Sequence, residues 1–343
     1  MPKKNLTNNS NLGLTMSLWL ARDTYDHDPE DAPQDDLPIV SVTQLLKPTK
    51  ALILGHRVEV EDAPTDLQDL AARVLGQSVH QAIEDSLNAT DRAEILESLK
   101  IPAKVAAKIR INPTAEEIAA DPEIIPVYAE RRAYRKITAS NGREVWISGK
   151  FDQVVNGQVE DNKTVPVYKY MKMDNSEKSD FALQQGIYRW LSPEIITSDM
   201  GKINFIFKDW TKGEAGRIPG YPPTPVFEMP IQLMDLKTTE GFIRRKLDEI
   251  LLTAGMEHEA DMPRCKDEEL WKSPDVHKYY KNAETAAAGG RSTKNFDTYP
   301  EAMQYKASQG GVGVVKIVAG EVRRCTYCEA APLCTQRLEY QTD

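Results

Sequence analysis

Two Asn-Gly dipeptides divide residues 127–163 into three segments in which apolar and polar residues alternate. The first lies in the turn Ser140-Asn141-Gly142, and the second is Asn156-Gly157. An Asn-Gly pair between alternating segments is the strongest short-range signal for a β-hairpin, because both residues tolerate the left-handed backbone of a tight turn. The pattern therefore predicts three consecutive strands, at residues 127–138, 143–155 and 158–163.

Helical spacing of apolar residues surrounds these strands. Thr65 could cap a long helix, and Ser41 or Thr43 a short one, because their hydroxyl oxygens can accept from free amides of a first turn. A further strand is expected at residues 202–210. The order of helices and strands predicts an α/β fold, in which helices flank a mixed sheet. The expected helices lie at residues 65–89, 91–99, 103–109, 179–191 and 234–256.

The distribution of charge decides which partners are plausible. The chain has 343 residues and a net charge of −9, which argues against a nucleic-acid partner. However, residues 23–36 hold seven acidic residues and no Lys or Arg, so the remainder carries only −2. This tract is either a solvated linker or a mimic of nucleic-acid phosphates. A basic patch follows at Arg131, Arg132, Arg135 and Lys136.

Neither a membrane nor a secretory segment is expected. No run of about 18 apolar residues occurs, so the sequence predicts no transmembrane helix and no membrane partner. Residues 1–15 are polar and lack the apolar region of a secretory signal. We therefore expect a cytoplasmic protein.

Two carboxylates and a lysine converge on the second hairpin. Asp152 lies near the end of one predicted strand, and Asp161 lies on its partner across the Asn-Gly turn. Two carboxylates at one place can hold a hard divalent cation. Lys163 is two residues from Asp161, so both project from the same face of a strand. Asp-x-Lys alone is a weak signal and is more typical of a surface ion pair. The hairpin context favours metal-assisted hydrolysis of a phosphodiester.

This arrangement resembles the PD-(D/E)xK nuclease superfamily, in its RecB-like branch, over residues 40–210. The resemblance implies a restriction-endonuclease-like mixed sheet and a helix that carries a histidine, which His80 matches. It implies that His80, Asp152 and Asp161 bind Mg²⁺ or Mn²⁺, with the carbonyl of Asn162 as a further ligand. Lys163 would act on the attacking water and stabilise the developing charge.

Three more residues match this branch. Gln184 and Tyr188 fit its Gln-x-x-x-Tyr motif on the helix after the lysine strand, where such residues face the DNA backbone and the active site. Glu130 resembles a glutamate that recurs before the Asp-bearing strand. The sequence departs from the pattern in two places. Phe151 precedes Asp152 where the superfamily has proline, and Asn162 replaces an aromatic residue.

The four cysteines indicate a second metal centre. Cys325, Cys328 and Cys334 form a Cys-x2-Cys-x5-Cys motif, and Cys265 is the fourth. Four thiolates suit either a tetrahedral Zn²⁺ or a [4Fe–4S] cluster, and spacing alone does not choose. Iron–sulfur nucleases of the RecB-like branch, which include AddB-type proteins, end in a similar motif, which favours the cluster. Their fourth cysteine precedes the core, whereas Cys265 follows it, so Zn²⁺ stays an alternative.

These inferences give an expected organisation and function. Residues 1–37 are a flexible acidic segment, residues 38–260 the nuclease core with a helical insertion, and residues 261–343 a loop-rich region that holds the cysteine cluster. The expected activity is that of a metal-dependent DNA exonuclease of recombination, repair or phage DNA metabolism, in the cytosol of a bacterium or a phage-infected host. The alternatives are a structure-specific endonuclease, or a protein that binds DNA ends or docks on a recombinase or single-strand-binding protein.

Overall fold

The computed structural model describes residues 5–22, 30–59 and 64–340. The chain forms two compact units. Unit 1 comprises Met1–Lys47 with Glu59–Leu252, and unit 2 comprises Pro48–Val58 with Thr253–Asp343. Every predicted nuclease residue belongs to unit 1 and every cysteine to unit 2.

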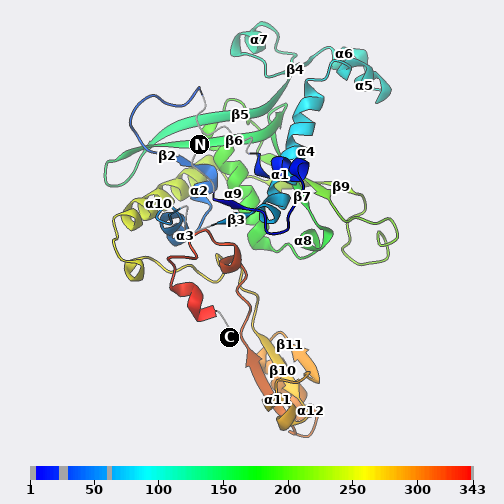
Figure 1. Ribbon diagram of the computed structural model, residues 1–343. Helices are drawn as coiled ribbons and strands as arrows, with labels where there is room; N and C mark the ends of the chain where they lie inside the picture. Colours follow the sequence, from blue (N-terminus) through cyan, green and yellow to red (C-terminus); the bar gives the residue numbers. More distant parts are fainter. Residues whose placement is uncertain (1–4, 23–29, 60–63, 341–343) are drawn as a thin grey trace. The chain divides into compact units, whose positions relative to one another are not determined.

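Unit 1 is built on one seven-stranded mixed sheet (Figure 1). Six strands run in the order β4-β5-β6-β7-β8-β9, and β2 pairs with β6. The pairs β5–β6, β6–β7 and β8–β9 are antiparallel, whereas β2–β6, β4–β5 and β7–β8 are parallel. The predicted α/β class with a mixed sheet is confirmed. The strands are β2 (Ile39–Ser41), β4 (Ile109–Ile111), β5 (Ile125–Thr138), β6 (Glu144–Val155), β7 (Gln158–Val165), β8 (Met200–Phe207) and β9 (Val226–Gln232).

The Asn-Gly turn between β6 and β7 has the backbone that its sequence predicts. Asn156 has φ 47° and Gly157 has φ 84°, so both central residues are left-handed, as a two-residue hairpin turn requires. Gly142, in the turn between β5 and β6, also has a positive φ of 83°. The turn chemistry therefore sets the register in which the predicted site residues face one another.

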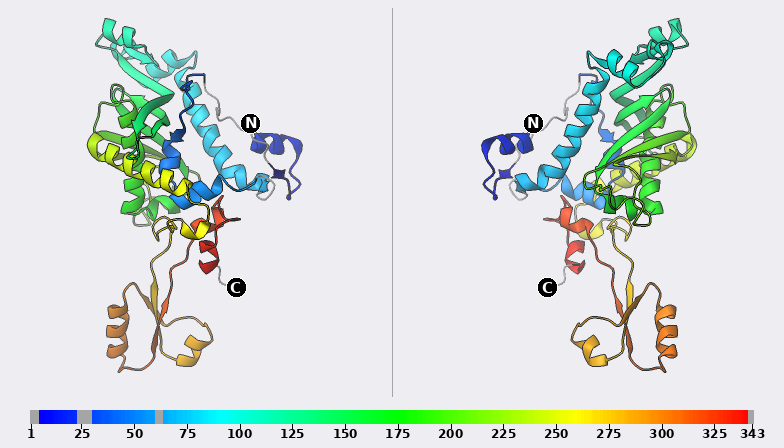
Figure 2. Two further views of the ribbon diagram at one scale, coloured as in Figure 1. Left: turned by 90° about the vertical axis from the view of Figure 1, so that its left-hand side faces the viewer. Right: turned by 90° about the vertical axis from the view of Figure 1, so that its right-hand side faces the viewer.

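Two long helices accompany the sheet. Helix α9 (Asn175–Leu191) contacts β6 through buried residues that include Ile187 and Leu191, four apart on one helix face. Gly149 of β6 permits this contact, because a Cβ there would lie 2.7 Å from the side chain of Leu191. Helix α4 (Ala71–Leu87) runs alongside the sheet and contacts β7 (Figure 2). The described helices include none that is long and apolar enough to cross a membrane.

The remaining helices of unit 1 differ in detail from the prediction. Ser41 caps α2 (Val42–Leu45) in a capping box with Gln44. The helix predicted to begin near Thr65 begins later, because Thr65–Asp66 forms strand β3 and Leu67–Leu70 a 3-10 turn. The helix predicted at residues 103–109 ends at Ala106, and the chain then enters strand β4. The other helices are α5 (Arg92–Ser98), α6 (Ala103–Ala106), α7 (Ala115–Ala120), α8 (Val167–Met171) and α10 (Leu236–Ala254).

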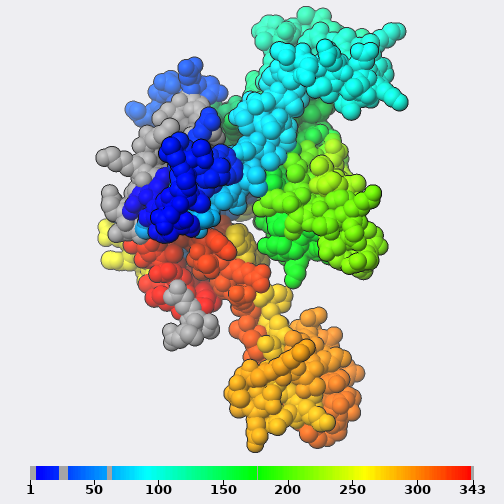
Figure 3. All heavy atoms as spheres, turned by 45° about the vertical axis from the view of Figure 1, so that its right-hand side comes forward, coloured from blue at the N-terminus to red at the C-terminus, as the bar shows by residue number. Residues whose placement is uncertain are grey.

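Helices α5, α6 and α7 form the expected helical insertion between α4 and β5, which stands out from the rest of unit 1 (Figure 3). The N-terminal segment is more ordered than predicted. Strand β1 (Leu6–Thr7) pairs with β3, and helix α1 (Leu14–Ala21) buries Leu20 against Leu67 and Val74. Residues 23–29 of the acidic tract lie outside the described residues.

Unit 2 corrects the expectation of a loop-rich C-terminal region. Residues 276–318 form a three-stranded antiparallel sheet, in the order β11-β10-β12, with two helices. Aromatic side chains hold it together: the rings of Tyr279 and Tyr305 lie 5.2 Å apart. A strand predicted at residues 312–318 matches β12, whereas β10 and β11 were not predicted, because they are short and lack clear alternation. The elements are α3 (Thr49–Gly55), β10 (Val276–Tyr280), α11 (Ala283–Ala287), β11 (Lys294–Phe296), α12 (Tyr299–Ser308) and β12 (Val314–Val318).

Candidate metal and nucleic-acid site

Asp152 lies where the pairing of β6 is interrupted on both sides. Between β5 and β6 the register pairs Ala129 with Gln153 and Arg131 with Phe151, and the ladder omits the intervening residues Glu130 and Asp152. The ladder with β7 reaches the pair Gln153 and Glu160 and stops there. Strand backbone released from pairing leaves polar groups without ladder partners. The side chain of Asp152 satisfies one of these backbone groups, because its Oδ2 accepts a hydrogen bond from the amide of Asn162 at 2.8 Å.

Glu130 causes the interruption with β5. Its φ of 51° is left-handed, a conformation that a non-glycine residue rarely adopts within a strand. A residue held there costs of order 1–3 kcal/mol and persists only where the surroundings enforce it. The consequence is that Glu130 is directed toward Asp152 on the neighbouring strand.

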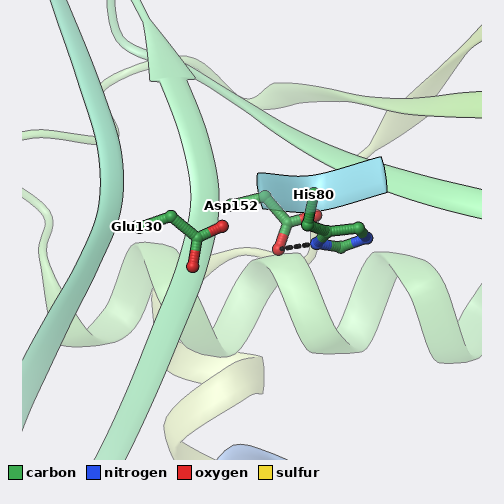
Figure 4. A group of neighbouring side chains, drawn as sticks. All are labelled: His80, Glu130 and Asp152. Atoms are coloured by element: carbon green, nitrogen blue, oxygen red, sulfur yellow. Dashed lines mark ion pairs between the residues drawn. The ribbon is translucent and has the colours of Figure 1, made fainter. Parts of the chain in front are cut away.

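His80, Glu130 and Asp152 form the candidate metal site. One ligand atom from each lies within 4.8 Å of the other two. They come from α4, β5 and β6, and their side chains turn toward one another (Figure 4). His80 Nδ1 lies 3.4 Å from Asp152 Oδ1. One imidazole nitrogen and two carboxylates are donors that divalent cations such as Mn²⁺ and Mg²⁺ accept.

Hydrogen bonding around His80 fits a bound cation. The other ring nitrogen, Nε2, lies 3.0 Å from the carbonyl oxygen of Asn162, which can only accept, so Nε2 carries a hydrogen. In the neutral ring, Nδ1 then presents a lone pair toward the Asp152 carboxylate. Two facing acceptors need a proton or a metal ion between them. The Oε1 atom of Glu130 is also buried, with no hydrogen-bond partner among the described residues.

The pKa values of the pair follow from this contact. The hydrogen bond to Asp152 raises the pKa of His80 above its ordinary value, against the opposing effect of burial. Burial acts to raise the pKa of Asp152, but the hydrogen bond and charge of His80 outweigh it, so that the pKa is lowered. The Asp152 carboxylate is therefore ionised beside an imidazole whose protonated form it stabilises, and a cation bound there would take the place of the Nδ1 proton.

Asp161 and Lys163 form a separate ion pair beside this group. Lys163 Nζ lies 2.6 Å from Asp161 Oδ2, and Asp161 is only 4% exposed. Asp161 was predicted as a metal ligand, but it is not among the three residues whose ligand atoms come together. Burial acts to lower the pKa of Lys163, but the Asp161 carboxylate outweighs it and raises that pKa. Lys163 is therefore an ammonium group, held by Asp161.

Asn162 links the two halves of the site through its backbone. Its amide donates to Asp152 and its carbonyl accepts from His80. The carbonyl was predicted to be a metal ligand, and it is instead directed to the imidazole. The buried side chain donates to Gln153 Oε1 at 2.9 Å. A polar Asn is therefore accommodated where related motifs carry an aromatic residue.

Gln184 and Tyr188 lie together on α9, as predicted for one helix face. Gln184 Nε2 donates to the Tyr188 hydroxyl at 3.1 Å. The ring of Tyr188 packs edge-on against Phe151, with centroids 6.4 Å apart. Burial raises the pKa of Tyr188, with a further rise from the charge of Asp161. The hydroxyl therefore keeps its proton and can serve as a donor.

The predicted basic patch is divided. Arg131 and Arg132 line a polar cleft of about 450 Å³ that also includes Glu130. Arg135 instead stacks on Trp190, with its guanidinium carbon 4.3 Å from the ring centre, and donates to the Trp190 carbonyl. Lys136 pairs with Asp35. The full lining is Asp31, Asn112, Ala129, Glu130, Arg131, Arg132 and Lys150.

Lys150 and Asn112 were not among the predicted site residues, whereas Asp31 belongs to the acidic tract for which mimicry of phosphates was one alternative. Lys150 Nζ lies 2.7 Å from Glu130 Oε2, so it holds one member of the metal group. Asn112 accepts from the amide of Ala129, next to the left-handed Glu130. Lys150 pairs with Arg132 in the β5–β6 ladder, so the strand register brings it beside the basic patch. No local pattern identifies Asn112, because it approaches from a distant segment.

In unit 2, one cavity is lined by all four cysteines, together with Lys50 and Arg324. The Gln336 side chain ties Cys265 to the C-terminal segment, accepting from its amide and donating to its carbonyl. Burial raises the pKa of Cys265 to about 11. All four cysteines are among the described residues, and no three of their sulfur atoms lie within 4.8 Å of one another.

The comparisons with known proteins do not identify a family. No family model matches the chain, and no curated protein does. The structure is similar to that of the protein SSO0001 (14% identity, 65% of this chain and 80% of that chain, TM-score 0.37). It is also similar to a phage-related exonuclease from Haemophilus somnus 129PT (13%, 51% and 82%, TM-score 0.21) and to Scheffersomyces stipitis Rai1 (12%, 80% and 72%, TM-score 0.19). Similarity this low leaves the function to be argued from the site.

Proposed function

We propose that the protein is a divalent-metal-dependent DNA nuclease with a restriction-endonuclease-like core of the RecB-like branch. One observation carries the proposal: His80, Glu130 and Asp152 bring three metal-ligand atoms within 4.8 Å of one another, next to the ion pair of Asp161 and Lys163. Three ligands beside a fixed ammonium group are the parts that metal-assisted phosphodiester hydrolysis requires.

The residues divide the chemistry among them. His80, Glu130 and Asp152 would hold Mg²⁺ or Mn²⁺, which supplies Lewis-acid stabilisation of a phosphoryl oxygen and activation of water. Asp161 holds Lys163, and the ammonium group orients the water and donates to the negative charge that develops on the phosphate. Tyr188 and Gln184 offer further donors.

DNA is the proposed substrate because cationic side chains line the cleft that contains Glu130. Arg131, Arg132 and Lys150 can bind successive phosphates of a strand, which positions it without reading its sequence. Digestion from ends, in recombination, repair or phage DNA metabolism, is the preferred form of the activity. A recombinase or a single-strand-binding protein is a candidate partner.

The second cofactor that we propose is a [4Fe–4S] cluster at the four cysteines of unit 2. The four cysteines line one cavity, and the resemblance of their spacing to that of iron–sulfur nucleases supports the cluster over a single ion. The charge of Arg324 favours the thiolate forms of Cys325 and Cys328, as ligation requires, whereas Lys50 is paired with Glu259.

The proposed function is tested with end-labelled linear duplex and single-stranded DNA in Mg²⁺ or Mn²⁺. The wild type should release nucleotides, and Lys163→Ala should lose roughly 10²–10³ in rate, as expected for loss of a transition-state donor. Lys172→Ala, which changes an exposed lysine beyond α8, is the matched control and should cleave normally.

The outcome separates the alternatives. Cleavage of closed circular DNA would indicate a structure-specific endonuclease. Binding of DNA without cleavage in any metal would indicate a protein that binds ends or docks on a partner. Equal rates in the wild type and Lys163→Ala would rule out the assigned chemistry.

A further inference from the structure

The described part of the acidic tract contacts the sheet at a defined place. Asp35 Oδ1 accepts from the indole nitrogen of Trp146 at 2.7 Å, and Asp35 Oδ2 from Lys136 Nζ at 3.2 Å. Lys136 in turn lies 5.0 Å from the centre of the Trp146 ring. Asp35 therefore binds a cation on β5 and a ring donor on β6, and both of these residues are paired across the two strands.

Strand β2 fixes the path of this segment. The amide of Trp146 donates to the carbonyl of Pro38 at 2.9 Å, and Ile39 pairs with Trp146 in the parallel β2–β6 ladder. The chain that precedes β2 must consequently leave from the surface that carries Trp146. Residues 30–37 have little freedom to lie elsewhere, because they are joined to an anchored strand.

The same segment reaches the candidate nucleic-acid cleft. Asp31 lines that cleft together with Arg131, Arg132 and Lys150, and with Glu130 of the metal group. Trp146, Lys150 and Asp152 are separated by even numbers of residues on β6, so they share one face of the strand. The acidic segment and the metal group therefore use the same face of β6.

The charges of segment and strand have the same spacing. Asp31 and Asp35 are four residues apart, as are Arg132 and Lys136 on β5. Four residues of a strand span about 13 Å. With Asp35 on Lys136 and Asp31 in the cleft that Arg132 lines, the segment sets carboxylates against cations of β5, which is the kind of contact that a phosphate backbone makes.

We propose that residues 30–36 are an intramolecular competitor for the DNA backbone, with Asp31 in the cleft of Arg131, Arg132 and Lys150 and Asp35 as its anchor on Lys136 and Trp146. This inference rests on the proposed function, since it assigns the regulation of the same site. DNA must displace Asp31 from the cleft before a strand lies against Glu130. The segment thus lowers the affinity of the cleft for nucleic acids that are short or that bind weakly. A polyanion of higher charge density displaces the segment.

The test measures affinity for a labelled linear duplex by fluorescence anisotropy, with the full chain and EDTA to prevent cleavage. Asp31→Asn should bind roughly threefold to tenfold more tightly at low salt, because one carboxylate no longer competes for the cations. Asp31→Glu keeps the charge and should bind like the wild type. Since the Debye length falls to about 3 Å at 1 M salt, the difference should shrink as salt rises.

Two further variants make the result specific. Asp35→Asn should also tighten binding, because it releases the anchor. Glu194→Gln removes one charge from an exposed carboxylate far along the chain from the acidic segment, and should change affinity far less. A gain of equal size in Glu194→Gln would mean that net charge alone acts, and would overturn the proposal.

The failures are distinguishable. Equal affinities of the wild type, Asp31→Asn and Asp35→Asn would overturn the competitor and leave the nuclease assignment intact. Tighter binding in both variants, with no cleavage by the wild type in Mg²⁺ or Mn²⁺, would support the competitor and refute the nuclease. Absence of DNA binding in every variant would refute both.

Discussion

The candidate metal site of unit 1 and the cysteine cavity of unit 2 are held together in different ways. In unit 1 the ligands stand on strands and a long helix. Hydrogen bonds with Asn162 hold Asp152 and His80, and an ion pair with Lys150 holds Glu130. In unit 2 the cysteines come from loops and a short 3-10 turn, and Gln336 supplies the hydrogen bonds that tie Cys265 in place.

The difference predicts different consequences of metal loss. The scaffold of unit 1 is a sheet with its own buried core, so that site should survive without its cation. The four cysteines that line the cavity of unit 2 come from segments far apart in the chain, so the cluster proposed there would cross-link them and stabilise that unit. Metal in unit 1 should therefore be needed for cleavage, and the metal group in unit 2 should be needed for the stability of that unit.

The largest expected effect is the loss of cleavage in Asp152→Asn. This change removes a charged ligand and leaves an isosteric side chain, so the fold should persist. The fall in rate should exceed the roughly 100-fold that loss of an outer-shell partner costs. Calorimetric titration with Mn²⁺ should show the same loss, while the melting temperature changes little. Wild-type Mn²⁺ affinity in this variant would refute the ligand assignment.

Removal of a cysteine thiolate tests the cavity of unit 2. Cys325→Ser should lose bound iron and lower the stability of unit 2, because the group that closes the cavity is gone. Mn²⁺ binding at unit 1 should remain. Metal analysis, the absorbance of an iron–sulfur chromophore and thermal melting measure these effects. Thr326→Ala, on the same turn, is the control. Full metal content in Cys325→Ser would exclude that cysteine as a ligand.

Glu130 offers a finer test, because its strained backbone can be separated from its carboxylate. Glu130→Ala and Glu130→Gly both remove the ligand and the ion pair with Lys150, so both should lose Mn²⁺ affinity. Glycine tolerates a φ of 51° without strain, so Glu130→Gly should be about 1 kcal/mol more stable than Glu130→Ala. Chemical denaturation measures the difference. Lower stability of the glycine variant would show that the left-handed backbone carries no strain.

The sequence predicted those parts of the fold and site that follow from local rules. The turn Asn156-Gly157 sets the register of β6 and β7, and helical spacing puts Gln184 beside Tyr188. Turn chemistry and helix periodicity act within a few residues, so they are legible in one sequence.

The parts that the sequence did not predict depend on interruptions and long-range contacts. Nothing local indicates that pairing stops at Asp152, which lets Glu130 join the metal group in place of Asp161. In the sheet of residues 276–318 only β12 was predicted. Strands β10 and β11 were missed because they are short and pair across long stretches of chain.

The smallest effects test how the basic patch is divided. Arg132 lines the cleft, whereas Arg135 packs on Trp190 and donates to its carbonyl. Arg132→Met should weaken DNA binding at every sequence and reduce the slope of log affinity against log salt by about 1, as loss of one phosphate contact does. Arg135→Met should leave that slope unchanged and lower the stability by about 1–2 kcal/mol, because it removes a cation–π contact and a hydrogen bond. The two variants change charge equally, so net charge cannot produce the contrast. An equal loss of slope in both would mean that Arg135 also meets the DNA, and that the face of β5 toward α9 belongs to the binding surface.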